Sequence, residues 1–205
     1  MIKFEDRIIP NTDKRVLQLS EKFREKGIPT ALSETLNELI LSVSIKHPKT
    51  ILEIGTAVGI SGSAMLFTHD DMFLTTIEKD EDSYLLASKT FSEFGLSSKV
   101  RQYLGDAGDI IRFLEGTYDF IFLDGAKARY YDYLPEIKRL LARGGVLFAD
   151  NVLFRGFIDG GVKYGHRDNT IVRNMRAFLS ELISDDNFVC SVYAKGDGIL
   201  KAYRK

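Results

Sequence analysis

The chain has 205 residues, of which 44% are hydrophobic and 28% are charged, and its formal net charge is −1 at pH 7. This length and composition fit one globular domain over 1–205 with a core of three layers, and they exclude a disordered chain. A net charge near zero excludes a general affinity for nucleic acid, so any such binding requires a local basic patch.

The first residues carry charges, at Lys3 and Arg7 among others, where a secretory signal needs an apolar core. No later run approaches the roughly 18 apolar residues of a membrane span. The sequence therefore predicts a cytoplasmic protein that does not enter a membrane. Its single cysteine, Cys190, excludes an internal disulfide and is expected to be a buried structural thiol.

Two helices are predicted at the N-terminus. Thr12 can cap a helix that ends at Gly27, and Ser33 can cap a second helix that runs to His47. We interpret residues 1–48 as a helical appendage to the core that follows.

Strand and helix patterns then alternate over 49–205, which is typical of a parallel sheet wrapped by helices. Five apolar strands are predicted first, with helices between them, at 50–54, 72–77, 100–104, 119–123 and 146–149. A loop over 153–167 and a helix over 169–183 lead to two last strands, 188–193 and 199–203. A Gly-Asp-Gly turn at 196–198 joins these strands and indicates a hairpin.

Oxygen-bearing side chains end two of the buried strands. Asp124 follows one strand, and Asp150 and Asn151 follow the next. The carboxyl ends of parallel strands line the crevice where ligands bind, and carboxylate and amide oxygens suit Mg²⁺ or Ca²⁺. Each motif has a structural alternative, since Asp often caps a following helix and Asp-Asn is a common turn pair. Two such strand ends beside a nucleotide-type loop favour the metal site.

A glycine-containing loop follows the first strand. It has Gly55, Gly59 and Gly62, but Ala57 stands where a dinucleotide fingerprint needs its second glycine, so a smaller nucleoside cofactor fits better. Glu78, at the end of the second strand, is placed to accept both hydroxyls of a ribose. Its alternative is to cap the helix that follows.

The end of the third strand offers a second cofactor contact. The turn Gly105-Asp106-Ala107-Gly108 can meet the edge and face of an adenine. Short Gly-Asp turns are also common without any ligand.

Together these motifs resemble the cation-dependent O-methyltransferases, the group of the catechol and caffeoyl-CoA enzymes. The resemblance spans about 28–205 and implies a Rossmann-like class I fold, a seven-stranded mostly parallel sheet with helices on both faces and an antiparallel C-terminal hairpin strand. It implies that Asp124, Asp150 and Asn151 ligate Mg²⁺, or another divalent cation such as Mn²⁺ or Ca²⁺. The residues expected to hold S-adenosylmethionine are Glu53, Gly55, Ser61, Glu78, Asp106, Ala107 and Asp124.

The resemblance also matches Lys127 to the general base of the family. Magnesium chelated by two adjacent substrate oxygens favours ionisation of the hydroxyl and orients it toward the sulfonium methyl group. Because an ordinary lysine is protonated at neutral pH, the role of base requires a nearby metal and partial burial. The alternative is a solvated loop lysine.

The substrate prediction depends on the segment 155–167 and the helix after it. This basic segment, followed by Arg173, suits a substrate with phosphates, and its alternative is a surface loop with solvated charges. The candidate contacts are Arg155, Lys163, Arg167 and Arg173, and Lys3, Arg7, Lys14 and Arg15 are possible additions.

The chain has no tryptophan for the aromatic gate of the catechol enzymes. It most closely resembles the bacterial tRNA 5-hydroxyuridine methyltransferases, which implies a tRNA anticodon loop as substrate. Two alternatives stay open: a methyltransferase of a small catechol or an acyl-CoA-linked phenol, and a non-catalytic adenosyl-ligand or RNA-binding module. The resemblance also implies a homodimer, with the two N-terminal helices as candidate interface.

Overall fold

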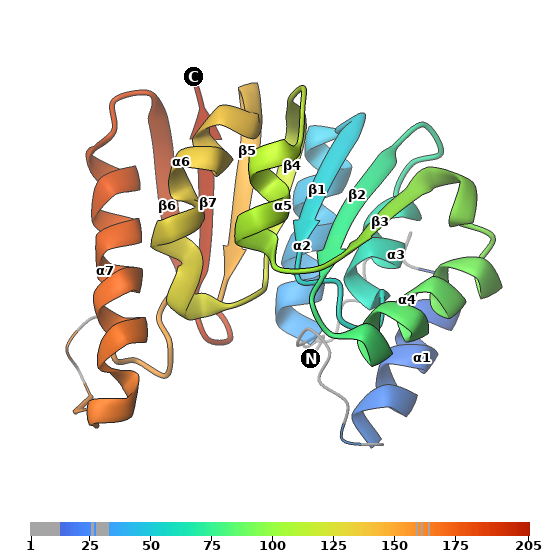
Figure 1. Ribbon diagram of the computed structural model, residues 1–205, viewed down its shortest axis with the longest axis horizontal. Coiled ribbons are helices and arrows are strands. Elements are labelled where there is room, and N and C mark those ends of the chain that lie inside the picture. The colour runs from blue at the N-terminus through green and yellow to red at the C-terminus, as the bar shows by residue number, and fades with distance from the viewer. Residues whose placement is uncertain (1–12, 26, 28–32, 159, 161, 164) are drawn as a thin grey trace, which may run out of the picture.

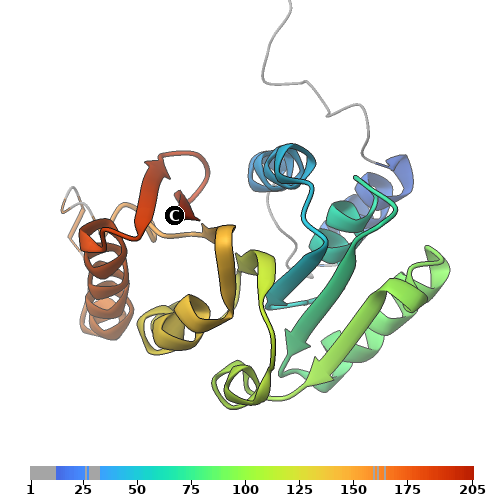
Figure 2. The same cartoon turned by 90° about the horizontal axis from the view of Figure 1, so that it is seen from above.

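A computed structural model describes residues 13–25, 27, 33–158, 160, 162–163 and 165–205. Its centre is a seven-stranded sheet in the order β3-β2-β1-β4-β5-β7-β6. Helices cover both faces of this sheet (Figure 1), and the view from above places α2 on one side and α5 and α6 on the other (Figure 2). The strands are β1 Thr50–Ile54, β2 Phe73–Glu78, β3 Val100–Leu104, β4 Tyr118–Leu123, β5 Leu141–Asp150, β6 Phe188–Tyr193 and β7 Ile199–Arg204.

The helices follow the predicted alternation with the strands. The α-helices are α1 Lys14–Glu25, α2 Ser33–Lys46, α3 Ile60–Leu66, α4 Glu81–Glu93, α5 Ala107–Phe113, α6 Tyr130–Leu140 and α7 Asn169–Ser184. The short 3₁₀ helices among the described residues are η2 Ser97–Lys99, η3 Lys127–Arg129 and η4 His166–Asp168.

The first five strands are parallel, and β7 inserts antiparallel between β5 and β6. The central strands β1, β4 and β5 are almost wholly buried, which is why their sequences are continuous apolar runs and not alternating ones. The predicted Rossmann-like, seven-stranded and mostly parallel sheet with its antiparallel C-terminal hairpin is confirmed.

Two apolar clusters fill the space on the two faces of the sheet. One contains side chains of α5, α6 and α7, and the other contains side chains of α1 to α4. Helices α1 and α2 therefore share the core on their face, with Val16 and Leu39 fully buried. The predicted division into an appendage over 1–48 and a core over 49–205 stays a prediction.

Most predicted boundaries are correct to within one or two residues. The exception is β5, which begins at Leu141 and not at Val146, because the strand includes the polar and glycine residues that precede its apolar run. A register shift between β4 and β5 accompanies this irregular start. Helix α2 begins at Ser33 as predicted, whereas the Thr12 cap lies outside the described residues.

Cys190 lies half-buried in β6, where its Sγ donates to the carbonyl of Leu182 at 3.4 Å. Burial raises the pKa of this thiol, which is the environment of a structural cysteine and not of a nucleophile. Within the described part of the chain, no helix combines the length and apolar character that crossing a bilayer requires.

Tyr130, the first residue of α6, connects the ends of β4 and β5. Its side chain is fully buried, and its hydroxyl lies 3.0 Å from the carbonyl oxygen of Leu123 and 3.2 Å from that of Asp150. The hydroxyl therefore donates between two strand ends that each carry a predicted metal ligand.

We expect Tyr130→Phe to lower the free energy of unfolding by about 1–3 kcal/mol, because a buried carbonyl loses its donor. Urea denaturation measures this change. The neighbouring Tyr131 is 39% exposed and provides the control, since Tyr131→Phe should change stability by less than about 0.5 kcal/mol. Equal stability of the Tyr130 variant and the parent would contradict the bridging role.

Candidate active site

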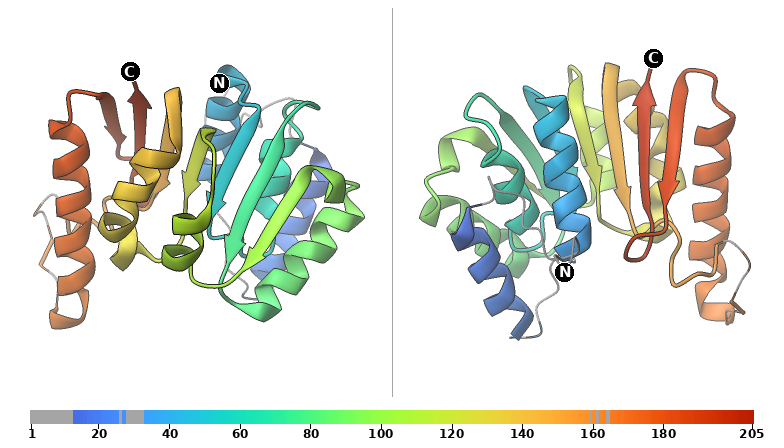
Figure 3. Two further views of the ribbon diagram at one scale, coloured as in Figure 1. Left: turned by 45° about the horizontal axis from the view of Figure 1, so that its top comes forward. Right: turned by 180° about the vertical axis from the view of Figure 1, so that it is seen from behind.

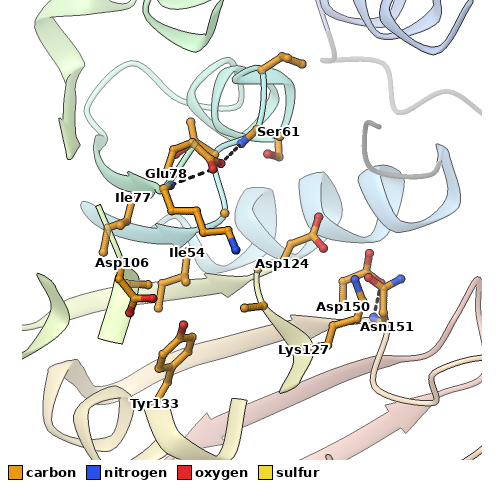
Figure 4. Close-up of a pocket in the computed structure, with 18 of the residues that line it drawn as sticks. Ile54, Ser61, Ile77, Glu78, Asp106, Asp124, Lys127, Tyr133, Asp150 and Asn151 are labelled. Atoms are coloured by element: carbon orange, nitrogen blue, oxygen red, sulfur yellow. Dashed lines mark hydrogen bonds between the residues drawn. The ribbon is translucent and has the colours of Figure 1, made fainter. Parts of the chain in front are cut away.

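A cavity of about 500 Å³ opens at the carboxyl ends of the parallel strands. The close-up shows two groups of polar side chains around it (Figure 4). Glu78, Asp106 and Tyr133 lie toward one end, and Asp124, Lys127, Asp150 and Asn151 lie toward the other. The fold thus brings the predicted cofactor residues and the predicted metal ligands into one cavity.

The loop after β1 forms a wall of the cavity and depends on glycine at position 55. Gly55 has a φ of 101°, and a Cβ atom there would lie 2.3 Å from the backbone oxygen of Asp124. Only glycine allows this approach. The loop and the end of β4 are therefore in direct backbone contact, and both line the cavity.

Glu78 is half-buried at the end of β2, and its carboxylate organises the surrounding backbone. One oxygen accepts from the amide of Ala57 at 2.8 Å, and the other accepts from the amides of Lys79 and Asp80 at 2.9 Å. The N-cap of α4 is Asp80, whose side chain accepts from Ser83. Glu78 is therefore not the helix cap, and its carboxylate lines the cavity.

Asp106 and Ala107 line the same end of the cavity. Asp106 caps α5 by accepting from the amide of Gly108 at 2.7 Å and also lines the cavity, and its contact with an adenine stays a prediction. Tyr133 of α6 also lines the cavity, and Arg129 lies over its ring at 5.6 Å. Tyr133 was not predicted, because it belongs to a helix that follows a different strand.

Glu53 is fully buried and is absent from the cavity wall, although Ser61 lines it. Its carboxylate accepts from Ser61 at 2.5 Å and from Thr76 at 2.7 Å. Burial raises the pKa of Glu53 to about 7, with smaller contributions from the charges of Asp124 and Glu78. The structure thus gives Glu53 a position beneath the cofactor loop and not the direct contact that the resemblance implies.

The predicted metal ligands lie together. Asp150 is 2% exposed, and its Oδ1 accepts from the amide of Asn151 at 2.7 Å and from Thr35 of α2 at 3.3 Å. In the part of the chain that the structure describes, the Asp124 carboxylate receives no hydrogen bond. Burial, and next the charge of Asp150, raises the pKa of Asp124 to about 7.

Lys127 supplies positive charge to this end of the cavity. It lines the wall, and its charge lowers the pKa values of Asp124 and Asp150 against the larger effect of burial. Within the described residues, no three His, Cys, Asp or Glu side chains gather as a metal site. The predicted ligand set differs from such a cluster because its third member is the amide of Asn151.

The four predicted substrate-binding residues do not line the cavity. They are exposed on the segment between β5 and the first turns of α7: Arg155, Lys163, Arg167 and Arg173. Arg176, on α7 behind them, donates to the carbonyls of Phe157 and Ile158 and holds this segment.

Of the additional basic residues, Lys3 and Arg7 lie outside the described residues. Lys14 is exposed on α1, and the Arg15 guanidinium pairs with Asp13 at 2.6 Å. The Arg15 guanidinium also lies over the rings of Phe67 and Phe94. Arg15 therefore attaches α1 to the rest of the domain.

Comparison with known proteins shows the family of this chain. Residues 15–205 match the model of the O-methyltransferase family. The chain belongs to the O-methyltransferase family. A Mycobacterium tuberculosis protein that carries the provisional name of an O-methyltransferase is 31% identical to this chain over 170 residues. The matched residues are 81% of this chain and 74% of that protein.

Solved structures agree with the family. A Staphylococcus aureus protein provisionally named a caffeoyl-CoA O-methyltransferase is 26% identical, with a TM-score of 0.85 over 93% of this chain and 92% of that one. A Bacillus cereus O-methyltransferase in complex with SAH has a TM-score of 0.84 at 23% identity, over 98% and 94% of the two chains, and shows the shared fold. The predicted enzyme class, an O-methyltransferase, is confirmed.

The buried Glu53 of this O-methyltransferase gives stability a pH dependence. Its pKa rises from 4.5 to about 7 on folding. Its stabilisation is therefore complete below the lower value and is lost as the pH rises through the upper one. We expect the parent to lose about 3 kcal/mol more between pH 4.5 and pH 8 than Glu53→Gln does.

Urea unfolding of both proteins across this range measures the difference. The exposed Glu81 at the start of α4 provides the control, since Glu81→Gln should keep the pH dependence of the parent. Parallel stability curves for the parent and Glu53→Gln would show that Glu53 titrates alike in the folded and unfolded chains.

Proposed function

We propose that this protein methylates the 5-oxygen of 5-hydroxyuridine at the wobble position of tRNA, using S-adenosylmethionine and Mg²⁺. The observation that supports the cation is the pair of carboxylates in the cavity. Asp124 and Asp150 lie at adjacent strand ends with the amide of Asn151 beside them. Burial and the charge of Asp150 raise the pKa of Asp124, so a divalent cation would stabilise the ionised carboxylates, and this donor set suits a hard ion.

The cofactor is assigned to the other end of the cavity. The Glu78 carboxylate already accepts three backbone hydrogen bonds, so it is held in place to accept the two ribose hydroxyls. Asp106 and Ala107 are placed for the adenine edge, and Gly55 allows the backbone to approach the ligand. S-adenosylmethionine in this position supplies an electrophilic methyl group.

The chain's own residues account for the remaining chemistry. A divalent cation held by Asp124, Asp150 and Asn151 supplies a positive charge that favours ionisation of the acceptor hydroxyl. Lys127, on the same wall, is the residue that we assign to take the proton of that hydroxyl. The acceptor oxygen then forms a bond to the methyl carbon, and the electron pair of the broken carbon–sulfur bond stays on sulfur.

A substitution at one end of the cavity should leave ligand binding at the other end intact. We expect Asp150→Ala to abolish methyl transfer and Mn²⁺ binding while S-adenosylmethionine still binds. Glu78→Ala should weaken S-adenosylmethionine by about 1.5–3 kcal/mol, the range for charged hydrogen bonds, and leave Mn²⁺ binding intact. Titration calorimetry with each ligand measures both effects, and EDTA should stop turnover by the parent.

Asp80→Ala removes the cap of α4 without touching the ribose site, so it should lower stability but not cofactor affinity. Full activity of Asp150→Ala in EDTA would contradict the metal role. An unchanged cofactor affinity in Glu78→Ala would leave Glu78 with a purely structural role.

The substrate assignment is supported by the position of the basic segment. Arg155, Lys163, Arg167 and Arg173 are exposed on the segment that directly follows the ligands Asp150 and Asn151. The segment therefore leaves the sheet from β5, the strand that carries Asp150, and not from β2, the strand that carries Glu78. A substrate that carries phosphates around a small acceptor base uses such an arrangement, and the neighbouring O4 and 5-hydroxyl of 5-hydroxyuridine can chelate one cation as a catechol does.

Removing positive charges from this segment should weaken the binding of tRNA and of no other ligand. We expect Arg155→Ala with Lys163→Ala to weaken tRNA binding and to reduce the slope of log affinity against log salt by about 1.5, because fewer counterions are released. Lys22→Ala with Arg143→Ala removes the same charge from exposed positions elsewhere and should have little effect.

Labelled S-adenosylmethionine allows turnover of tRNA carrying 5-hydroxyuridine and of a catechol to be compared in all three proteins. Catechol turnover by the parent far above tRNA turnover would reject the tRNA substrate and favour a small phenol. Cofactor binding without turnover of either substrate would favour a non-catalytic module.

A further inference from the structure

The backbone that carries Asp150 and Asn151 has an unusual conformation. Asn151, Phe154 and Arg155 have φ values of 58°, 39° and 57°. Residues other than glycine rarely adopt this left-handed region, and such conformations persist where surrounding contacts impose them. We call residues 150–155 the ligand corner. Its shape must be maintained by contacts from elsewhere in the chain.

The turn between β6 and β7 provides these contacts. The amide of Val152 donates to the carbonyl of Gly198 at 3.0 Å, and the amide of Leu153 donates to the carbonyl of Asp197 at 2.9 Å. The amide of Arg155 donates to the carboxylate of Asp197. Asp197 thus accepts through both its backbone and its side chain, and its carboxylate is the contact at the far end of the corner.

The turn also fits closely against the corner. Gly198 is buried with a φ of 90°, and a Cβ atom there would lie 2.4 Å from Cγ of Leu153. The backbone of the turn therefore cannot come closer to the backbone of the corner without a steric clash. This contact fixes the distance between the turn and the corner, while the Asp197 carboxylate fixes the direction of the Arg155 amide.

Helix α2 anchors the turn. Glu38 of α2 pairs with Lys195 in the turn and, at 2.9 Å, with Lys201 of β7. One helical turn earlier, Thr35 donates to the carboxylate of Asp150. The view from behind (Figure 3, right) shows α2 beside β4 and β5. The β6–β7 turn lies at the edge of the sheet where these two strands end (Figure 3, right). The helix therefore supports the ligand corner directly and through the turn.

We propose that Asp197 is a positioning residue that holds the ligand corner in the geometry required for cation binding. The proposal rests on the proposed function, because it assumes that Asp150 and Asn151 ligate the cation. Asp197 does not line the cavity, so it acts through the backbone of the corner. The necessary property is a hydrogen-bond acceptor at this position, which asparagine also provides.

The experiment compares Asp197→Ala, Asp197→Asn and the parent, with Asp186→Ala as control, since Asp186 is exposed in the turn that precedes β6. Hydrogen exchange is measured first, on metal-free protein. We expect the amides of residues 152–155 to exchange at least tenfold faster in Asp197→Ala, and at the parent rate in Asp197→Asn and Asp186→Ala. Amides of β1 and β4 report whether any variant is unfolded.

Calorimetry with Mn²⁺ and with S-adenosylmethionine follows. Asp197→Ala should bind Mn²⁺ about tenfold more weakly, the size typical of residues that orient metal ligands, while Asp197→Asn stays within about threefold of the parent. Cofactor affinity should be unchanged in all variants. Unchanged exchange at 152–155 in Asp197→Ala overturns the proposal, and so does parental Mn²⁺ affinity in that variant.

A parent that binds no divalent cation would reject the metal part of the proposed function. Faster exchange in Asp197→Ala alone would then still establish the role of Asp197 in holding the corner. Loss of Mn²⁺ affinity in Asp197→Asn as well would overturn the proposal, because the charge of Asp197 and not its hydrogen bond would be the effective property.

Discussion

Two carboxylates held close together, away from most of the solvent, are the constraint on which this site depends. Asp124 and Asp150 end adjacent parallel strands, and burial makes their charged forms costly. The surroundings offset this cost only in part. Lys127 supplies one positive charge, and among the described residues Asp150 receives hydrogen bonds, from Thr35 and from the Asn151 amide, whereas Asp124 receives none. The charge of Asp124 is therefore the less compensated of the two, and the proposed cation would offset it.

The features that depend on one strand alone could be predicted from the sequence. Continuous apolar runs located the central strands, and the polar residues at their ends became neighbours because parallel strands end at one edge. Glu78, Asp124 and Asp150 were found in this way. The predicted β5 began too late because Leu141 already pairs with Tyr118 of β4, before the irregular stretch that holds the Gly-Gly pair, and the apolar run shows only the regular part of the strand.

Other residues could not be found because they reach the site from distant parts of the chain. Thr35 lies 115 residues before Asp150, and Tyr133 belongs to a helix that has no cofactor motif. For Glu53 the sequence predicted the strand but not the surroundings of the side chain. Ser61 and Thr76 pack around its carboxylate and hold it beneath the loop after β1. Periodicity assigns a residue to a strand, and only tertiary packing decides which ligand or side chain it meets.

The insertion of β7 between β5 and β6 has a consequence for biosynthesis. Asp150 pairs with Ile199, so the far edge of β5 is completed only when β7 has been made, after α7 and β6. During translation the first five strands can assemble while the side of β5 that faces β7 still has unpaired backbone groups. The part of the site that Asp150 forms in a nascent chain is therefore completed only after β7 is made, and a premature stop before β7 leaves a sheet with an open edge beside Asp150.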